Sequence, residues 1–381
     1  MTAISTWAQP AGAAAIGTGT VMPPEWASHA RTWMEFPTPN PVFGEQDSPT
    51  LRAAQLAWAG IANTLVAYEP VTMLAPRPWL MVARQMLMPG VRVCPALLQN
   101  AWLRDSGPTF VHTGDGMPHV VSWTFNGWGS ESHTQWANWD TERTVARRVA
   151  ELADVPVLRS PLVTEGGGMA VDGEGTVLLT DSVQLDPHRN PGWTRAGVEA
   201  EVHARLGTDT AIWLPRGLTG DHTQFGTQGH IDMLVTFARP GVVLVHTQND
   251  PGHPDFEVSR RTIELLCTAR DARGRRLAVV PLPAPKALEV DGQPSLYSYV
   301  HHYVANDVVL MGAFDDPSDA LAAHILRRVY RGREVILVDA RTLFAYGGGV
   351  HAITLQQPCG QWPGSPGPTP WRDTVRGKIG A

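Results

Sequence analysis

The chain has 381 residues, of which 43% are hydrophobic and 17% are charged, and its formal net charge at pH 7 is −6. This composition is ordinary for a globular protein with a large core, and the acidic balance lacks the basic footprint of a nucleic-acid-binding protein. No run of about 18 apolar residues occurs, so the sequence predicts no membrane-spanning helix.

The first 22 residues are rich in Ala, Gly and Thr and have neither a basic start nor a continuous apolar core. We therefore expect residues 1–22 to be a flexible lead-in rather than a signal peptide, and residues 23–381 to form one domain. Cys94, Cys267 and Cys359 are unevenly spaced with no Cys-x-x-Cys pair, which indicates neither a disulfide framework nor a zinc site. A reducing cytoplasm fits this pattern.

A helix is predicted after Ser48, because Ser48 suits the N-cap, Pro49 suits the first helical position, and apolar residues then repeat at helical spacing. A β-rich run follows at residues 71–74. The same order of a helix and then a short strand returns four more times. The helices are expected near residues 140–153, 194–206, 256–271 and 317–331, and the strands near residues 155–158, 211–214, 277–282 and 335–338. Five such units indicate a ring of modules, whereas a doubly wound sheet is the competing interpretation.

The stretch 102–110 reads Trp-Leu-Arg-Asp-Ser-Gly-Pro-Thr-Phe and ends in a Gly-Pro turn before a predicted strand. This order predicts that Asp105 lies at a strand edge or in a loop, although an aspartate in such a turn also commonly caps its own backbone. A second glycine-rich turn, Thr-Glu-Gly-Gly-Gly, contains Glu165, and turn chemistry alone would explain its glycines.

The stretch 225–232 reads Phe-Gly-Thr-Gln-Gly-His-Ile-Asp and is followed by an apolar run. We expect His230 and Asp232 to lie two apart at the start of a strand, so that both side chains point to one face. A histidine and a carboxylate directed into one pocket suit acid–base chemistry. A buried structural histidine beside a surface aspartate is the alternative.

The stretch 346–358 reads Tyr-Gly-Gly-Gly-Val-His-Ala-Ile-Thr-Leu-Gln-Gln-Pro. Three consecutive glycines allow positive φ and a close approach to a ligand, and the apolar run after them predicts a loop that leads into a strand. By itself this pattern also fits a glycine-rich hairpin turn.

Together these stretches resemble the agmatine deiminase family, relatives of the bacterial peptidylarginine deiminases in the guanidine-modifying (pentein) superfamily, over nearly the whole chain. The resemblance implies a five-bladed α/β propeller with pseudo-fivefold helix–strand modules and a central site. It implies that Asp105 and Asp232 hold a substrate guanidinium and that His230 is the general acid and base. The other substrate-binding positions that it implies are Glu165, Trp102, Gly348 and Gly349.

The reaction implied by the resemblance is hydrolysis of a guanidino group to a ureido group with release of ammonia, by default from agmatine to N-carbamoylputrescine. A cysteine attacks the guanidinium carbon and forms a thiouronium intermediate, and no metal or organic cofactor is needed. The expected partner is a small cationic guanidino compound, with no nucleic acid or membrane, and a homo-oligomer is left open.

Three departures bear on this expectation. Ala352 stands where the family has its nucleophilic cysteine, His301 stands where Asn is expected, and Asn306-Asp307 replaces an Asn-Gly turn. Either a Cys→Ala change was made, which the persistence of Asp105, His230 and Asp232 favours, or the chain is a non-catalytic guanidine-binding relative. Cys359 is expected to lie outside the pocket. The departure at His301 leaves open arginine or another guanidino compound as the substrate.

Overall fold

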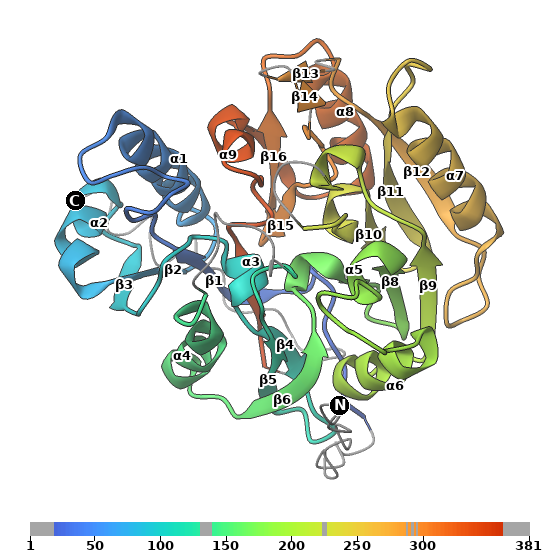
Figure 1. The fold of residues 1–381 in the computed structure, drawn as a ribbon, viewed down its shortest axis with the longest axis horizontal. Coiled ribbons are helices and arrows are strands. Elements are labelled where there is room, and N and C mark those ends of the chain that lie inside the picture. Colours follow the sequence, from blue (N-terminus) through green and yellow to red (C-terminus); the bar gives the residue numbers. More distant parts are fainter. Residues whose placement is uncertain are drawn as a thin grey trace, which may run out of the picture.

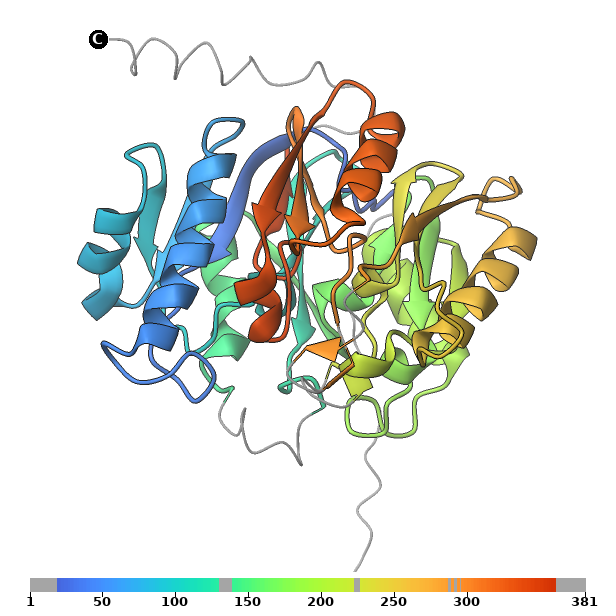
Figure 2. The same cartoon turned by 90° about the horizontal axis from the view of Figure 1, so that it is seen from above.

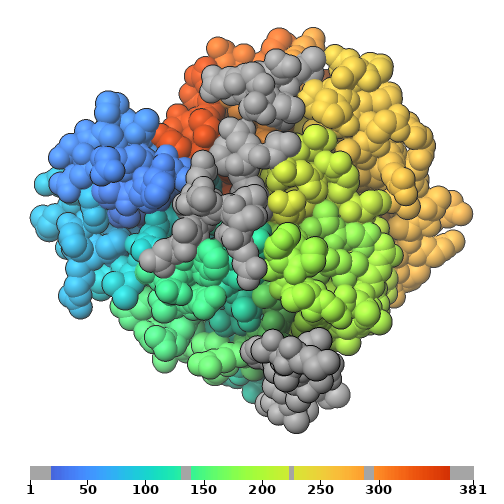
Figure 3. Space-filling model, in the orientation of Figure 1, coloured from blue at the N-terminus to red at the C-terminus, as the bar shows by residue number. Residues whose placement is uncertain are grey.

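The computed structural model describes residues 19–129, 139–222, 227–286, 289–290, 293–294 and 296–360. Most of the predicted lead-in, residues 1–18, therefore lies outside the described residues, as does the end of the predicted domain beyond residue 360. The described chain is a mixed α/β fold with five sheets of three or four strands and a small hairpin. Figure 1 shows the five sheets arranged around a common centre, and the surface follows the same circular order (Figure 3).

The strands of the five sheets follow one connection rule. In each sheet an antiparallel pair is followed by a parallel pair, and a helix connects the two parallel strands. The first sheet has the strand order β18 (Leu355–Pro358)–β1 (His29–Glu35)–β2 (Val71–Ala75)–β3 (Arg92–Pro95). The second and third sheets are β4 (Thr109–His112)–β5 (Pro118–Thr124)–β6 (Val157–Val163) and β7 (Ala170–Val171)–β8 (Thr176–Thr180)–β9 (Thr210–Leu214). The fourth and fifth sheets are β10 (Val235–Arg239)–β11 (Val242–Thr247)–β12 (Ala278–Pro283) and β15 (Tyr303–Ala305)–β16 (Val308–Ala313)–β17 (Glu334–Asp339). The hairpin consists of β13 (Glu289–Val290) and β14 (Gln293–Pro294). The competing interpretation, a doubly wound sheet, is therefore wrong.

The five predicted connecting helices are all present. They are α1 (Pro49–Leu65), α4 (Val145–Ala153), α6 (Arg195–Leu206), α7 (Asp255–Thr268) and α8 (Asp319–Val329). Helix α1 begins as predicted, because the Ser48 side chain accepts a hydrogen bond from the Leu51 amide. Helix α4 begins five residues later than predicted, since residues 142–144 form a 3₁₀ turn. The first unit and the unit of α7 lie on opposite sides of the molecule (Figure 2).

The described ranges also contain shorter helices. They are α2 (Leu80–Met86), α3 (Leu103–Ser106), α5 (Asp181–Gln184) and α9 (Arg341–Ala345), of which α2 lies between β2 and β3 and α5 between β8 and α6. The last described strand, β18, pairs with the first, β1, so that Leu355 lies opposite Trp33. The first sheet thus contains both the first and the last described strand, and the loop before β18 is held at the centre of the molecule.

Apolar side chains fill the space between the sheets and their helices. The largest buried side chains include Trp33, Trp58 and Phe43, none of which is exposed. The indole of Trp58 donates to the Ala101 carbonyl at 3.1 Å, which fixes α1 against the segment before α3. Within the described ranges, no helix combines the length and the apolar character needed to cross a bilayer.

Candidate active site

Side chains from five separate segments line one cavity near the centre of the fold, and the empty space in it, including solvent at its opening, is about 440 Å³. The lining residues are Trp102, Asp105, Trp128, Asp221, Thr227, His230, Asp232, Met233, His301, Tyr346, Gly347, Gly348 and Ala352. Six of the eight predicted site residues belong to this set. Glu165 and Gly349 do not line the cavity.

Asp105 lies in the short helix α3, not at a strand edge or in a loop as the sequence predicts. The prediction was wrong because one helical turn forms before the Gly-Pro turn, with the Gly107 amide donating to the Leu103 carbonyl. The Asp105 Oδ2 accepts from the indole of Trp128 at 3.0 Å. Burial raises the pKa of Asp105 to about 6. The negative charges of Asp232 and Glu165 also raise this pKa, whereas the positive charge of His230 lowers it.

His230 and Asp232 share the cavity as predicted but do not start a strand. Ile231–Met233 is a 3₁₀ turn, and β10 begins two residues later. The reason is the backbone before it, since Gln228 and Gly229 both have positive φ and turn the chain sharply. Burial alone would lower the pKa of His230, but Asp105 and Glu165 outweigh it and raise that pKa to about 9.

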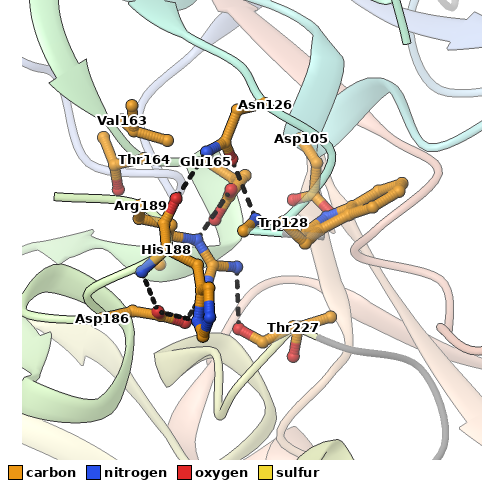
Figure 4. Close-up of polar contacts among 12 residues, drawn as sticks. Asp105, Asn126, Trp128, Val163, Thr164, Glu165, Asp186, His188, Arg189 and Thr227 are labelled. Atoms are coloured by element: carbon orange, nitrogen blue, oxygen red, sulfur yellow. Dashed lines mark hydrogen bonds and ion pairs between the residues drawn. The ribbon is translucent and has the colours of Figure 1, made fainter. Parts of the chain in front are cut away.

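Glu165 is a partner of His230 and has no exposed surface. Its Oε2 lies 3.0 Å from Nε2 of His230, and its Oε1 accepts from Nε of Arg189 at 3.0 Å. Figure 4 shows Arg189 held in turn by Asp186 and the Thr227 carbonyl. Burial would raise the pKa of Glu165, but Arg189 and His230 hold it at about 2. Both oxygens of this carboxylate are therefore already bound to cations.

The backbone of Gly167 shows how closely the predicted groups converge. A Cβ on this residue would lie 2.5 Å from His230 Nδ1, 3.0 Å from Asp232 Oδ2 and 3.1 Å from Asp105 Oδ1. Such distances forbid any side chain here. The turn that contains Glu165 thus has a steric role beyond turn formation, because it leaves space in which one imidazole and two carboxylates meet.

Asp232 is bracketed by two histidines. Its Oδ2 lies 2.7 Å from Nδ1 of His351 and 3.4 Å from Nε2 of His301, while its Oδ1 is buried and has no partner in the described part of the chain. Burial would raise the pKa of Asp232, but His301 and His351 hold it well below its usual range. His351 also lies 2.7 Å from Oε2 of Glu25 through its Nε2.

Most glycines of the loop before β18 are required because a side chain would clash with neighbouring atoms. Only Gly347 has a positive φ, of 109°. A Cβ on Gly348 would lie 2.6 Å from the Trp102 ring, and a Cβ on Gly349 would lie 2.5 Å from His301 Nδ1. The loop leads into β18 as predicted. Ala352, which lies in this loop, lines the cavity. Cys359 does not line the cavity, as expected.

Several residues near the cavity carry no signal in the sequence. Asp221 lines it and is buried, with its Oδ2 unpaired in the described ranges, and burial raises its pKa to about 7. Glu25, which contacts His351 from the N-terminal side, also stands outside every motif. A lone acidic residue in a loop could not be told from a surface residue by sequence pattern.

Residues 21–358 match the protein family described as Porphyromonas-type peptidyl-arginine deiminase. A putative agmatine deiminase of Streptomyces coelicolor is 55% identical over 338 residues, which cover 88% of this chain and 98% of that protein. An agmatine deiminase of Stutzerimonas stutzeri is 37% identical, over 89% of this chain and 96% of that protein. The solved structure of the agmatine deiminase of Enterococcus faecalis has a TM-score of 0.85 at 27% identity, over 93% of this chain and 100% of that one.

Proposed function

The chain belongs to the Porphyromonas-type peptidyl-arginine deiminase family, and we propose that its cavity binds agmatine through the guanidinium group and is built to hydrolyse it to N-carbamoylputrescine and ammonia. The observation that carries this proposal is the convergence of Asp105, His230 and Asp232 around Gly167. Relatives named agmatine deiminase support the choice of substrate.

The two carboxylates suit a guanidinium ion. This ion is planar and has N–H groups on several edges, so two carboxylates can hold it by charge-assisted hydrogen bonds. Asp105 and Asp232 are both buried, which strengthens each bond to a cation. A bound cation also favours the ionised form of Asp105, whose pKa burial raises to about 6.

The chemistry requires a nucleophile at position 352. A cysteine thiolate there would form a bond to the guanidinium carbon, and the C–N bond would break as His230 protonates the leaving ammonia. A water molecule deprotonated by His230 would then attack the same carbon and release the thiolate and the ureido product. Ala352 cannot form the first bond, so the chain with Ala352 is expected to bind the substrate without turnover by this route.

The architecture and setting are part of the proposal. The five sheets are the blades of a pseudo-fivefold α/β propeller in which β18 closes the first blade, and residues 23–381 act as one domain. The shared connection rule of the sheets supports this assignment. We place the protein in the cytoplasm, where three unpaired cysteines would stay reduced.

Calorimetry with agmatine tests the binding assignment. Asp105→Asn and Asp232→Asn should each weaken binding by roughly 2–5 kcal/mol, because each removes one partner of a buried charged pair. Asp115→Asn, at an exposed turn, is the matched control and should leave the affinity unchanged. Unaltered affinity in both cavity variants would refute the assignment.

A non-catalytic guanidine-binding protein is the second candidate, and Ala352 is the observation that favours it. Both candidates bind a guanidine through the same carboxylates. They differ only in whether restoring the cysteine restores turnover.

A further inference from the structure

Three side chains beside the cavity bring metal-ligating atoms together. Asp232, His301 and His351 each offer one ligand atom, and these atoms all lie within 4.8 Å of one another. They come from the 3₁₀ turn before β10, the segment before β15 and the loop before β18. No sequence motif links them.

Two of these groups have atoms that the described protein leaves unsatisfied. Asp232 Oδ1 and His301 Nδ1 are buried and have no hydrogen-bond partner within the described ranges, and the two residues are only 5% and 3% exposed. Buried polar atoms without partners are costly, and the open Asp232 Oδ1 can accept a cation. Nε2 of His301 lies 3.4 Å from Asp232 Oδ2, so the proton shared between these two atoms must leave before Nε2 binds a metal ion.

The third ligand, His351, is supported from behind. Its Nε2 lies 2.7 Å from Oε2 of Glu25, and the other oxygen of Glu25 accepts from the Val304 amide at 2.8 Å. A carboxylate that accepts from the distal nitrogen of a histidine orients the ring and makes its other nitrogen a better ligand. His351 therefore has the environment of a metal-ligating histidine.

We propose that Asp232, His301 and His351 bind a divalent transition-metal ion of the Zn²⁺ type. Two imidazoles and one carboxylate suit Zn²⁺, whereas Mg²⁺ and Ca²⁺ prefer oxygen ligands. Zinc bonds of about 2.0–2.1 Å in tetrahedral geometry place ligand atoms about 3.4 Å apart. The separation of Asp232 Oδ2 from His301 Nε2 is already 3.4 Å. The 2.7 Å separation from His351 Nδ1 must lengthen as the shared proton leaves.

The proposed site uses one of the departures from the resemblance, the histidine at position 301. His301 supplies a ligand where Asn is expected, and Ala352 follows His351 directly without offering one. Three protein ligands leave a fourth position for water. The site does not depend on the proposed function, and the family resemblance calls for no metal.

Titration calorimetry of the purified, chelator-treated protein with ZnCl₂ tests the site. The chain as written should bind one Zn²⁺ ion, and His301→Asn should weaken binding at least about 100-fold, since it removes a direct ligand. His324→Asn, at an exposed position on α8, is the matched control and should bind as the parent does. Failure to bind Zn²⁺, or equal affinity in His301→Asn and His324→Asn, would overturn the proposal.

Two further measurements guard against misfolding and confusion with substrate binding. Co²⁺ should give tetrahedral visible absorption bands that are absent in His301→Asn, and Zn²⁺ should raise the Tm of the parent but not of that variant. Glu25→Gln should weaken Zn²⁺ binding about 10- to 100-fold, and an unchanged affinity would count against the site. Because Asp232 belongs to both proposals, agmatine binding is measured on the chelator-treated protein. Agmatine binding without Zn²⁺ binding would then refute only the metal site, whereas the reverse result would refute only the proposed function.

Discussion

Glu69 and Asp221 are both buried carboxylates, but their surroundings differ. Glu69 accepts hydrogen bonds from Thr32, from His29 at 3.2 Å and from the Asn306 amide at 2.7 Å. These bonds join the first unit to the fifth. Asp221 lines the cavity, and its Oδ2 has no partner in the described ranges.

The pKa values follow this difference. Burial would raise the pKa of Glu69, but His29 and the other donors lower it. Burial raises the pKa of Asp221 to about 7. The nearby negative charge of Asp232 also raises this pKa, whereas the positive charge of His230 lowers it. A carboxylate with all its partners stabilises the fold, whereas a buried carboxylate oxygen without a partner in the described protein costs stability that a cationic ligand can offset.

The largest effect is expected from completing the cavity. Ala352→Cys should restore release of ammonia from agmatine, because only the attacking atom is missing. Adding His230→Ala should then lower the rate by roughly 10²–10⁴-fold, since His230 carries the proton in both half-reactions. A coupled ammonia assay measures both changes.

Cys359→Ser in the Ala352→Cys background is the control, and it should stay active because Cys359 lies outside the cavity. If Ala352→Cys binds agmatine but forms no ureido product from any guanidine tried, the protein is a binding protein on a hydrolase scaffold.

Asp221→Asn should change how stability depends on pH. The folded pKa of about 7 exceeds the ordinary value of 3.8, so the unfolded chain releases its proton first as pH rises. This residue therefore makes the parent less stable as pH increases from about 4 to 7, and the loss levels off above 7. Removing the group should reduce that loss by about 2–4 kcal/mol.

Urea unfolding at pH 4 and pH 7 gives the difference directly. Asp209→Asn, at an exposed position before β9, should retain the pH dependence of the parent. An identical pH dependence in Asp221→Asn and the parent would show that the carboxylate finds a partner in the folded protein.

Glu69→Gln should destabilise the fold by about 1.5–3 kcal/mol, because it replaces a charged acceptor and leaves buried donors unpaired. Glu334→Gln is the matched control, since Glu334 accepts from Tyr68 in an exposed pair at 2.6 Å and should change stability little. Denaturant midpoints compare the two variants. Equal stability in both would contradict the structural role of the Glu69 cluster.

The smallest effect concerns substrate choice. Ala352→Cys should prefer agmatine to free arginine by at least about tenfold, or about 1.4 kcal/mol. The α-carboxylate of arginine would add a negative charge to a cavity already lined by Asp105, Asp221 and Asp232. Competition between the two compounds for turnover measures the ratio, and a preference for arginine would reverse the assignment.

The sequence predicted well what depends on neighbouring residues. Helix α1 begins at Ser48 because a cap, a proline and an apolar repeat act within a few positions. The strands after the five connecting helices were found for the same reason. The local structure at Asp105 and Asp232 was predicted wrongly, because a single helical turn and a 3₁₀ turn leave no periodic pattern to detect.

The sequence by itself determined the five repeated units, the glycine-rich turns and the motifs that carry Asp105, His230 and Asp232. Only the tertiary structure decided that Glu165 neutralises Arg189 and pairs with His230, that Asp221 enters the cavity, and that His351 reaches Asp232, which lies 119 positions away along the chain. Such contacts depend on how five sheets pack around one centre, and burial then sets each charge. Distance along the chain carries no information about either.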